Sequence, residues 1–185
     1  MIRFVKIFNE LYALLLGQFL LFPKLNLNLL RVYGKVFIFG NKSNLTIGKK
    51  CKFYDSVTIK LSDNYIYNEI VLGDEVLLET GVYLNAHNGT INLESNVFVG
   101  VRSIIQGKGG VSIGQWSMLG PNVQLYSSDH VVKTFTVPYS KQGEVASEII
   151  IGKNVWLCSN VVCLRGVNVP DNSVISVGNV LKRAK

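Results

Sequence analysis

The sequence predicts one all-β solenoid, in which short parallel strands wind around an apolar core. Three observations indicate this fold: an apolar residue returns every six positions, a small or acidic residue often follows it, and a second small or branched residue comes four places after it. Period six fits neither a helix nor simple strand alternation, and hexapeptide repeats are typical of a parallel β-helix. The apolar positions are Leu72, Leu78, Leu84, Leu93, Val99, Ile105, Ile113, Leu119, Leu125, Ile151, Leu157, Cys163, Val169, Ile175 and Leu181.

The spacing of equivalent apolar residues sets the size of one turn. Leu72, Leu93 and Ile113 are 21 and 20 residues apart, so three hexads and one or two corner residues make a coil. Roughly seven coils fit in the chain, with parallel strands ~4.8 Å apart and the apolar residues stacked inside. Residues 32–60 read as irregular first coils, and residues 62–68 as a small excursion loop.

One long insertion interrupts the repeat. The next residue equivalent to Ile113 is Ile151, and the excess falls in residues 131–148, a polar segment with Pro138 and Gly143. A loop of this length on a regular solenoid is more often functional than accidental. We therefore expect a protruding loop at about 131–148.

The N-terminus departs from the period of six. In residues 1–22, polar residues recur at helical spacing and leave a wide apolar face, which predicts an amphipathic helix. The apolar stretch is too short and too charged to span a bilayer, and no small-residue cleavage site follows it. We divide the chain into this helix or cap, residues 1–31, and a β-helix domain, residues 32–185.

The charge is unevenly distributed. The net charge is +7, and residues 1–60 carry ten basic and two acidic residues. A basic region beside an apolar helix face favours contact with a membrane surface through residues 1–35. The compatible alternative is that the helix caps the open end of the solenoid. No nucleic-acid partner is expected, because aromatic and basic residues are not interleaved on one face.

Histidine is a natural general base near neutral pH, and the sequence contains two. His130 lies where the repeat breaks into the long loop, whereas His87 reads as a corner residue. Asp129 precedes His130 on extended backbone and so points to the opposite side. We expect a main-chain carbonyl to orient the imidazole of His130.

The composition argues against a metal site and a disulfide framework. Two histidines without clustered cysteines or carboxylates do not make a three-histidine zinc site. Cys51, Cys158 and Cys163 fit neither paired bridges nor a CxxC motif, and they are expected to be buried, reduced thiols of a cytosolic protein.

Two further residues stand out in the repeat. Trp156 occupies a position that elsewhere holds Phe98 and Met118 and is expected to point outward, at a subunit interface or in a substrate groove. Lys108 lies in the Gly-rich segment 107–110, which lacks the spacing and the following helix of a P-loop and therefore predicts a turn.

The later repeats contain three informative segments: SMLGPNVQLYSSDH, which ends at His130, IIIGKNVWLCSN, which contains Trp156, and GVNVPDNSVISVGNVL. The order of histidine, loop, Asn-Val-Trp and final coils resembles the hexapeptide-repeat O-acetyltransferases. This family includes maltose and galactoside acetyltransferases and the bacterial capsule, lipopolysaccharide and exopolysaccharide acetyltransferases. The resemblance covers about residues 70–181.

The resemblance implies a left-handed parallel β-helix, a homotrimer with active sites between subunits, acetyl-CoA as co-substrate and no metal. The family's catalytic histidine falls on His130, which would deprotonate an acceptor hydroxyl for direct attack on the thioester. The family's tryptophan falls on Trp156, in the substrate groove. Residues matching the coenzyme A groove, or placed to meet its phosphates, are Ser159, Arg165, Val177, Gly178, Lys182 and Arg183.

The sequence departs from the family pattern in three places. The family's acceptor-holding asparagine is replaced by Gly100, so Asn85 and Arg102 are the candidate substitutes. The usual Ala-Gly pair of the coenzyme A groove is Val177-Gly178, which narrows that wall. The family usually continues into a proline-bearing tail, so weaker coenzyme A binding is expected unless the basic C-terminal residues compensate.

These features predict an acetyl-CoA-dependent O-acetyltransferase that modifies a sugar hydroxyl in bacterial surface-polysaccharide biosynthesis. We expect it in the cytoplasm, peripherally on the inner membrane. Two alternatives stay open: an N-acetyltransferase of an amino-sugar nucleotide, and a non-catalytic hexapeptide-repeat scaffold. Gly100 favours the scaffold, whereas His130, its loop and Trp156 argue against it.

Overall fold

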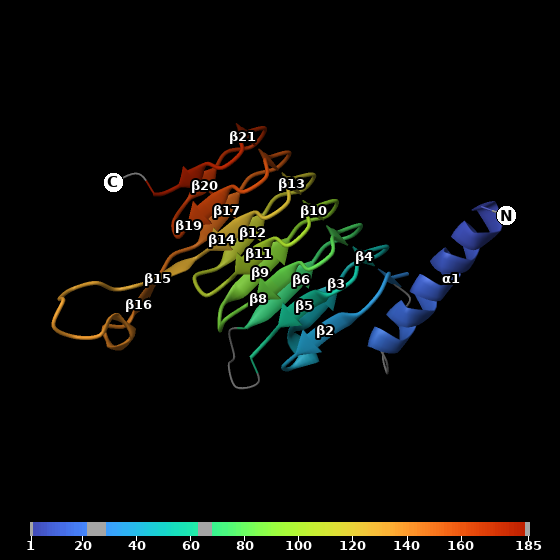
Figure 1. Cartoon of the computed structure of the whole chain (residues 1–185), viewed down its shortest axis with the longest axis horizontal. Helices are drawn as coiled ribbons and strands as arrows, with labels where there is room; N and C mark the ends of the chain where they lie inside the picture. Colours follow the sequence, from blue (N-terminus) through green and yellow to red (C-terminus); the bar gives the residue numbers. More distant parts are fainter. Residues whose placement is uncertain (1, 22–28, 63–67, 184–185) are drawn as a thin grey trace.

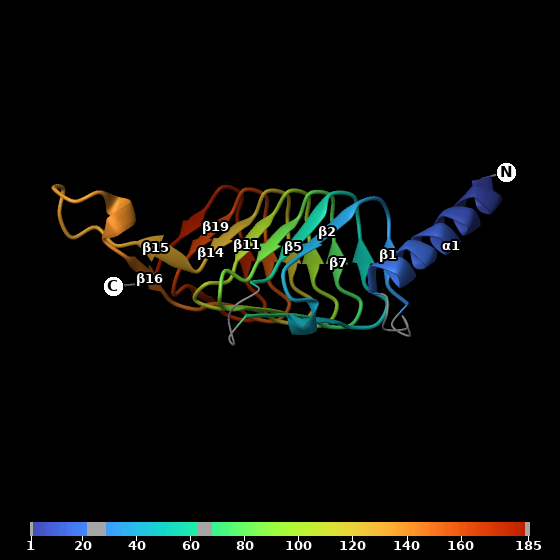
Figure 2. The same ribbon diagram turned by 90° about the horizontal axis from the view of Figure 1, so that it is seen from below.

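The structure, a computed structural model, describes residues 2–21, 29–62 and 68–183. Parallel strands stack along one axis from the N-terminal to the C-terminal coils, with helix α1 (Ile2–Leu21) at one end (Figure 1). A long loop projects from the other end (Figures 1 and 2). Of the predicted excursion loop, residues 63–67 lie outside the described part of the chain.

Three parallel sheets form the solenoid. Sheet A contains β1 (Arg31–Val32), β4 (Lys52–Phe53), β7 (Leu77–Leu78), β10 (Phe98–Val99), β13 (Met118–Leu119), β18 (Trp156–Leu157) and β21 (Val174–Ile175). Sheet B contains β2 (Val36–Phe39), β5 (Val57–Lys60), β8 (Tyr83–Asn85), β11 (Ile104–Gln106), β14 (Gln124–Tyr126), β19 (Val162–Leu164) and β22 (Val180–Leu181). Sheet C contains β3 (Leu45–Ile47), β6 (Glu69–Leu72), β9 (Thr90–Leu93), β12 (Val111–Ile113), β17 (Ile149–Ile151) and β20 (Asn168–Val169).

The chain visits sheets A, B and C in turn, so the coils build a prism with three faces and three corners. The predicted left-handed parallel β-helix of about seven coils is confirmed, since sheets A and B each contain seven strands. Below, a corner is named by the two sheets that it joins. The B–C corner therefore lies opposite sheet A.

The predicted apolar positions point into this prism. Leu78, Val99 and Leu119 are fully buried and pair in register in adjacent strands of sheet A. Such stacking lets each coil bury its apolar side chains against the coils on both sides, which is where the hydrophobic stabilisation of a solenoid arises.

The first coils are more regular than the sequence suggested. Ile47, Phe53 and Ile59 are buried at intervals of six residues, in sheets C, A and B respectively. The large Phe53 stands where later coils carry leucine or valine, which obscured the period in residues 32–60.

Buried serines satisfy main-chain groups inside two corners. Ser103 Oγ donates to Gly120 O at 3.1 Å and accepts from Val123 N at 3.2 Å. Ser117 Oγ bonds Gly152 O and Val155 N in the same way, at 2.7 and 3.0 Å. These hydroxyls explain why serine replaces valine at some small inward positions, because a buried main-chain group needs a partner.

The C–A corners bring successive coils close together. A Cβ atom on Gly114 would lie 2.6 Å from the carbonyl carbon of Gly152 in the next coil, so no side chain fits there. The second residue of each corner adopts the left-handed conformation, which asparagine tolerates well, as at Asn96 and Asn154. Trp116 holds the same place with φ 64°, an uncommon conformation for a bulky residue.

The predicted loop begins as an antiparallel ribbon at the B–C corner. β15 (Ser128–His130) pairs with β16 (Glu144–Ala146), and the 3-10 helix η2 (Tyr139–Lys141) lies in the loop between them. The side chain of Gln142 organises the loop: its Oε1 accepts from Lys133 N, and its Nε2 donates to Val137 O at 2.7 Å. A second 3-10 helix, η1 (Lys42–Asn44), lies in the first coil.

Helix α1 rests on the first coil through one face. Ala13 is buried there, and Leu16 packs against the core. Glu10 forms an ion pair with Arg31 at 2.8 Å and accepts a hydrogen bond from Tyr33 Oη at 2.8 Å. Burial and this hydrogen bond raise the pKa of Tyr33 to about 12. The described helices include none long and apolar enough to span a membrane.

Because the coils stack, replacement of one inward residue is expected to lower the free energy of unfolding far more than replacement of its outward neighbour. Leu93→Ala removes a fully buried side chain from the middle of sheet C and is expected to lower the free energy of unfolding by about 2–5 kcal/mol. Asn92→Ala, on the exposed face of the same strand, is expected to stay within about 0.5 kcal/mol. Urea unfolding followed by circular dichroism measures both, and equal losses would contradict the stacking argument.

Candidate functional site

His130 lies at the B–C corner, at the base of the protruding loop. Val131 N–H donates to Gly143 O, and Ser147 N–H donates to Ser127 O, each at 3.0 Å. Because bonded and non-bonded pairs alternate in an antiparallel ribbon, the intervening pair His130–Glu144 is a non-hydrogen-bonded pair. Side chains of such a pair share one face and lie close together.

Glu144 is therefore the acidic neighbour of His130. Its Oε1 lies 4.0 Å from His130 Nδ1, and the His130 side chain is 57% exposed against 30% for Glu144. The same carboxylate forms an ion pair with Lys108, from the B–C corner of the preceding coil. A base, a carboxylate and a cation thus line up along one edge of the prism.

Asp129 faces the other side of the ribbon, as its position next to His130 predicts. Its Oδ2 accepts a hydrogen bond from Arg165 Nε at 2.9 Å, from the following coil. Asp129 is therefore paired with Arg165. The main-chain carbonyl partner of the His130 imidazole stays a prediction, and the ribbon register brings the carboxylate of Glu144 to 4.0 Å from Nδ1.

The segment that contains Lys108 is a turn, as predicted. Gly110 N–H donates to Gly107 O at 2.9 Å, and Gly109 N–H donates to Ser127 Oγ at 2.9 Å. A Cβ atom on Gly109 would lie 2.5 Å from Ser127 O, so the turn presses against the coil that carries His130. This contact fixes the backbone from which Lys108 reaches Glu144.

Asn85 lies on the same side of the prism as His130. It is in register with Gln106 and Tyr126 along the outer face of sheet B, near the B–C corner. Its coil is two below that of His130, or about 10 Å along the axis at ~4.8 Å per coil. Its Oδ1 already accepts a hydrogen bond from His87 N at 3.0 Å.

Trp156 lies on a different face. It is 47% exposed on the outside of sheet A, in register with Met118 and Val174. Because the B–C corner is opposite sheet A, one chain does not bring Trp156 and His130 together.

The residues matched to the coenzyme A groove fall into two groups. Ser159, Val177 and Gly178 stack at the A–B corner, where Gly178 N–H donates to Ser159 O at 3.1 Å. Lys182 and Arg183 follow β22 and are exposed. The side chain of Arg183 covers Gly166, so it reaches toward the B–C corner.

Arg102 lies at the A–B corner with φ 57°, above Gly81 and two coils below Ser159. It therefore belongs with the Ser159 group. The spacing signals of the sequence did not identify Glu144, Gln106 or Tyr126, since these become neighbours of the site only through coil stacking and the ribbon register.

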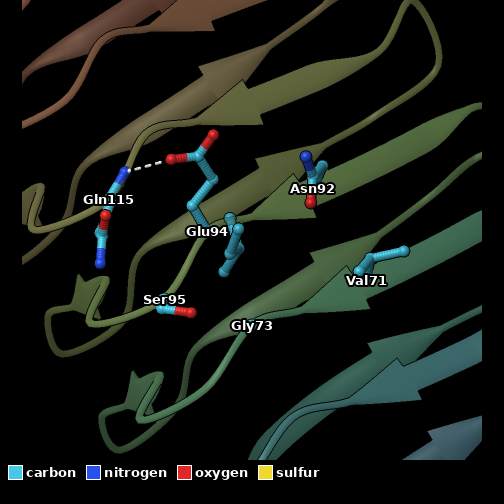
Figure 3. A pocket seen from close by; sticks show the side chains of 7 residues that line it. Val71, Gly73, Asn92, Glu94, Ser95 and Gln115 are labelled. Atoms are coloured by element: carbon cyan, nitrogen blue, oxygen red, sulfur yellow. Dashed lines mark hydrogen bonds between the residues drawn. The ribbon is translucent and has the colours of Figure 1, made fainter.

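A shallow pocket of about 230 Å³ lies elsewhere, on the outer face of sheet C (Figure 3). Asn92, Glu94 and Ser95 line it beside Gly73. Glu94 Oε2 accepts a hydrogen bond from Gln115 N at 2.9 Å, which closes one coil corner on the next (Figure 3). None of the predicted site residues lines this pocket.

The two buried thiols are poor candidates for a nucleophile. Burial raises the pKa of Cys51 to about 11 and that of Cys163 to about 12, so both thiols stay protonated at neutral pH. Desolvation and the positive charges of Lys108 and Lys60 lower the pKa of His87. Within the described residues, no three His, Cys, Asp or Glu side chains form a group that would hold a metal ion.

Comparison with known proteins agrees with the hexapeptide-repeat fold. Residues 91–127 and 148–183 match the family described as the hexapeptide repeat of succinyl-transferase. The galactoside O-acetyltransferase of Escherichia coli is 33% identical over 113 residues, which is 60% of this chain and 54% of that protein. The polysialic acid O-acetyltransferase of Neisseria meningitidis is 29% identical over 70% of this chain and 59% of that protein.

A solved structure has the same fold. A variant of the N-acyltransferase AntD from Bacillus cereus, in complex with dTDP-4-amino-4,6-dideoxyglucose and coenzyme A, superposes with a TM-score of 0.54. The two sequences are 12% identical, and the match covers 84% of this chain and 71% of that one.

The resemblance to hexapeptide-repeat acetyltransferases is confirmed, and the hexapeptide-repeat model matches the chain on both sides of the His130 loop. The chain spans about half the length of the galactoside acetyltransferases that it matches.

Proposed function

We propose that this protein is an acetyl-CoA-dependent acetyltransferase that modifies a sugar hydroxyl, with His130 as general base. The observation that carries the proposal is the placement of His130: an exposed imidazole beside a carboxylate, at the root of the loop that interrupts the repeat. The relatives named for transfer to galactosides and to polysialic acid support a sugar or polysaccharide acceptor.

In the proposed reaction, an unprotonated nitrogen of His130 removes the proton of the acceptor hydroxyl. The oxygen attacks the thioester carbonyl of acetyl-CoA, and the carbon–sulfur bond breaks as the ester forms. The proton then passes from His130 to the departing thiolate, so the histidine returns to its starting state. Main-chain N–H groups at the corner are suited to stabilise the oxyanion.

Acetyl-CoA as donor is consistent with the residues present. Gly178 lies beside Ser159 at one corner and has no side chain to obstruct an extended pantetheine arm. Lys182 and Arg183, with Arg165 nearby, provide cations for the phosphates. Asn85 and Arg102 are the proposed acceptor contacts in place of the family asparagine.

N-acetylation of an amino-sugar nucleotide is the second candidate. It is supported by a sequence relative, the dTDP-4-amino-4,6-dideoxy-D-glucose acyltransferase of Escherichia coli, which is 24% identical over 74% of this chain. Mass spectrometry separates the two reactions after alkaline treatment, since an ester releases acetate under mild alkali and an amide does not.

Loss of the His130 imidazole tests the catalytic role. His130→Ala is expected to slow acetyl transfer by about 10²- to 10⁴-fold, because no other general base takes its place. His87→Ala, at a corner two coils away, is the matched control and is expected to keep the wild-type rate. Calorimetry should find acetyl-CoA binding unchanged in both variants. Wild-type activity in His130→Ala would refute the role, and a wild-type chain that binds no acetyl-CoA would favour the scaffold.

We also propose a homotrimer in which each active site lies between two copies. Trp156 and His130 occupy opposite sides of one chain, so a groove that contains both requires a second copy. The exposed column Met118, Trp156 and Val174 on sheet A supports this face as the interface. Aromatic and methionine side chains are enriched at interfaces of this kind.

Charge on that face should separate the copies. Met118→Glu is expected to convert the trimer to monomers in light scattering coupled to size exclusion, because it buries an unpaired charge in the interface. Thr46→Glu, on the exposed face of sheet C, is expected to leave the trimer intact. Dissociation of both variants, or of neither, would argue against sheet A as the interface.

A cytoplasmic protein held at the inner face of the membrane is the proposed location. Ile7, Phe8, Leu11, Tyr12 and Leu15 are 54–68% exposed and lie on the face of α1 opposite Ala13. Exposed lysines of the first coils, such as Lys35, Lys42 and Lys49, supply the positive charge that anionic lipids attract. One face of α1 thus caps the solenoid while the other is free to enter the lipid interface.

Liposome co-sedimentation tests the lipid contact. Leu11→Glu is expected to weaken binding to phosphatidylglycerol vesicles by at least about 10-fold, because burial of one leucine contributes ~2 kcal/mol. Asn9→Glu makes the same charge change on an exposed residue outside the apolar face and is expected to bind nearly as well as wild type. Equal binding by all three proteins would exclude this face as the anchor.

A further inference from the structure

The polar neighbours of His130 indicate that other side chains assist it as a general base. The side chain of its cross-strand neighbour Glu144 is 30% exposed, and Lys108 holds that carboxylate from the coil before. Both partners come from segments that the coil stacking and the ribbon register fix in place. The other nearby carboxylate, Asp129, is bound to Arg165 on the opposite face of the ribbon.

We propose that Glu144 is a positioning residue for His130, and that Lys108 keeps Glu144 in place. The proposal rests on the proposed acetyl transfer. At the separation of 4.0 Å, the two side chains are too far apart for a hydrogen bond, and a rotation of the exposed imidazole brings Nδ1–H to Oε1 in the free protein. Glu144 then accepts a hydrogen bond from Nδ1–H and does not itself take the proton.

This contact selects the tautomer of the imidazole. When Nδ1 carries the hydrogen and donates it to Glu144, the lone pair on Nε2 is free to receive the proton of the acceptor hydroxyl. The imidazolium formed during transfer carries a positive charge beside the Glu144 carboxylate, which stabilises it. The proton leaves again from Nε2 to the coenzyme A thiolate.

Lys108 prevents the carboxylate from turning away. Its ion pair with Glu144 is partly shielded, because both side chains are about 30% exposed. The Gly-rich turn around Lys108 therefore has a role that a phosphate loop would not explain: it lets the backbone lie against Ser127 and brings the ammonium group to the ribbon.

The tautomer of His130 is measurable without any substrate. The chain has two histidines, so long-range ¹⁵N–¹H spectra of ¹⁵N-histidine-labelled protein contain two imidazoles, and His87→Asn assigns them. At the high-pH plateau, we expect wild-type His130 to carry its hydrogen on Nδ1. Glu144→Gln should shift it toward Nε2–H, the form that free histidine side chains favour. The same tautomer in both proteins would overturn the proposal.

Matched variants separate positioning from general damage. Glu148→Gln makes the same chemical change at a residue that bonds Ser112 Oγ at 2.8 Å, and it should leave the His130 tautomer unchanged. Lys108→Met should lower the Nδ1–H fraction, and Lys108→Arg should restore it. An unaltered tautomer in Lys108→Met would remove Lys108 from the proposal.

Kinetics give the second readout. Glu144→Gln is expected to lower kcat by about 10- to 100-fold, as misplacement of a reacting group does, with the KM for acetyl-CoA unchanged. A change in KM alone would overturn the positioning role. If wild-type protein transfers no acetyl group, the proposed function fails, while the ¹⁵N spectra still decide whether Glu144 orients His130.

Discussion

Stacking of equivalent positions in successive coils is the constraint on which this molecule depends. Gly73 N–H donates to Leu93 O, and Glu94 N–H donates to Ile113 O, so each coil obtains its main-chain partners from the next coil. The inward side chains follow the same register, and Leu72 lies over Leu93 in sheet C. A single coil has neither a core nor satisfied main-chain groups by itself. Most inward side chains and corner residues are therefore needed to hold the coils together. Residues that bind substrates or catalyse a reaction have to lie on the outer surface.

The B–C corner is the place where the chain leaves the regular repeat. Between β14 and β17 the loop leaves the solenoid, yet β12 still pairs with β17 as if nothing had been inserted. The insertion leaves the pairing of β12 with β17 intact, and its two ends are held together by the β15–β16 ribbon. The groups at its root are tied to neighbouring coils, Glu144 to Lys108 below and Asp129 to Arg165 above. The inserted segment thus carries His130 on a base fixed by the neighbouring coils, which suits a residue that must meet two substrates.

The two ends of the solenoid are differently occupied. Helix α1 packs on the first coil through Ala13 and Leu16, and the loop extends past the last coils (Figure 2). His130 follows the fifth of seven coils, so it stands about 20 Å along the axis from the first coil at ~4.8 Å per coil. With α1 on a lipid surface, the proposed site would lie within reach of a membrane-attached saccharide. The exposed face of sheet A is left for a second copy, and that copy is what would bring a tryptophan to His130.

The sequence by itself determined the solenoid, its apolar interior and the site of the long loop, because period six is a local property that each short strand displays. It also singled out His130 and Trp156. Phe53 and Ile59 continue the series that begins at Ile47, and the large side chain of Phe53 concealed this period in the sequence. Only the tertiary structure decided that Glu144 faces His130, that Lys108 holds it, and that Trp156 lies on the opposite side of the chain. Those relations depend on ribbon register and on the order of faces around a coil. Sequence spacing does not fix either one, since the path of an inserted loop is set by how its ends pair.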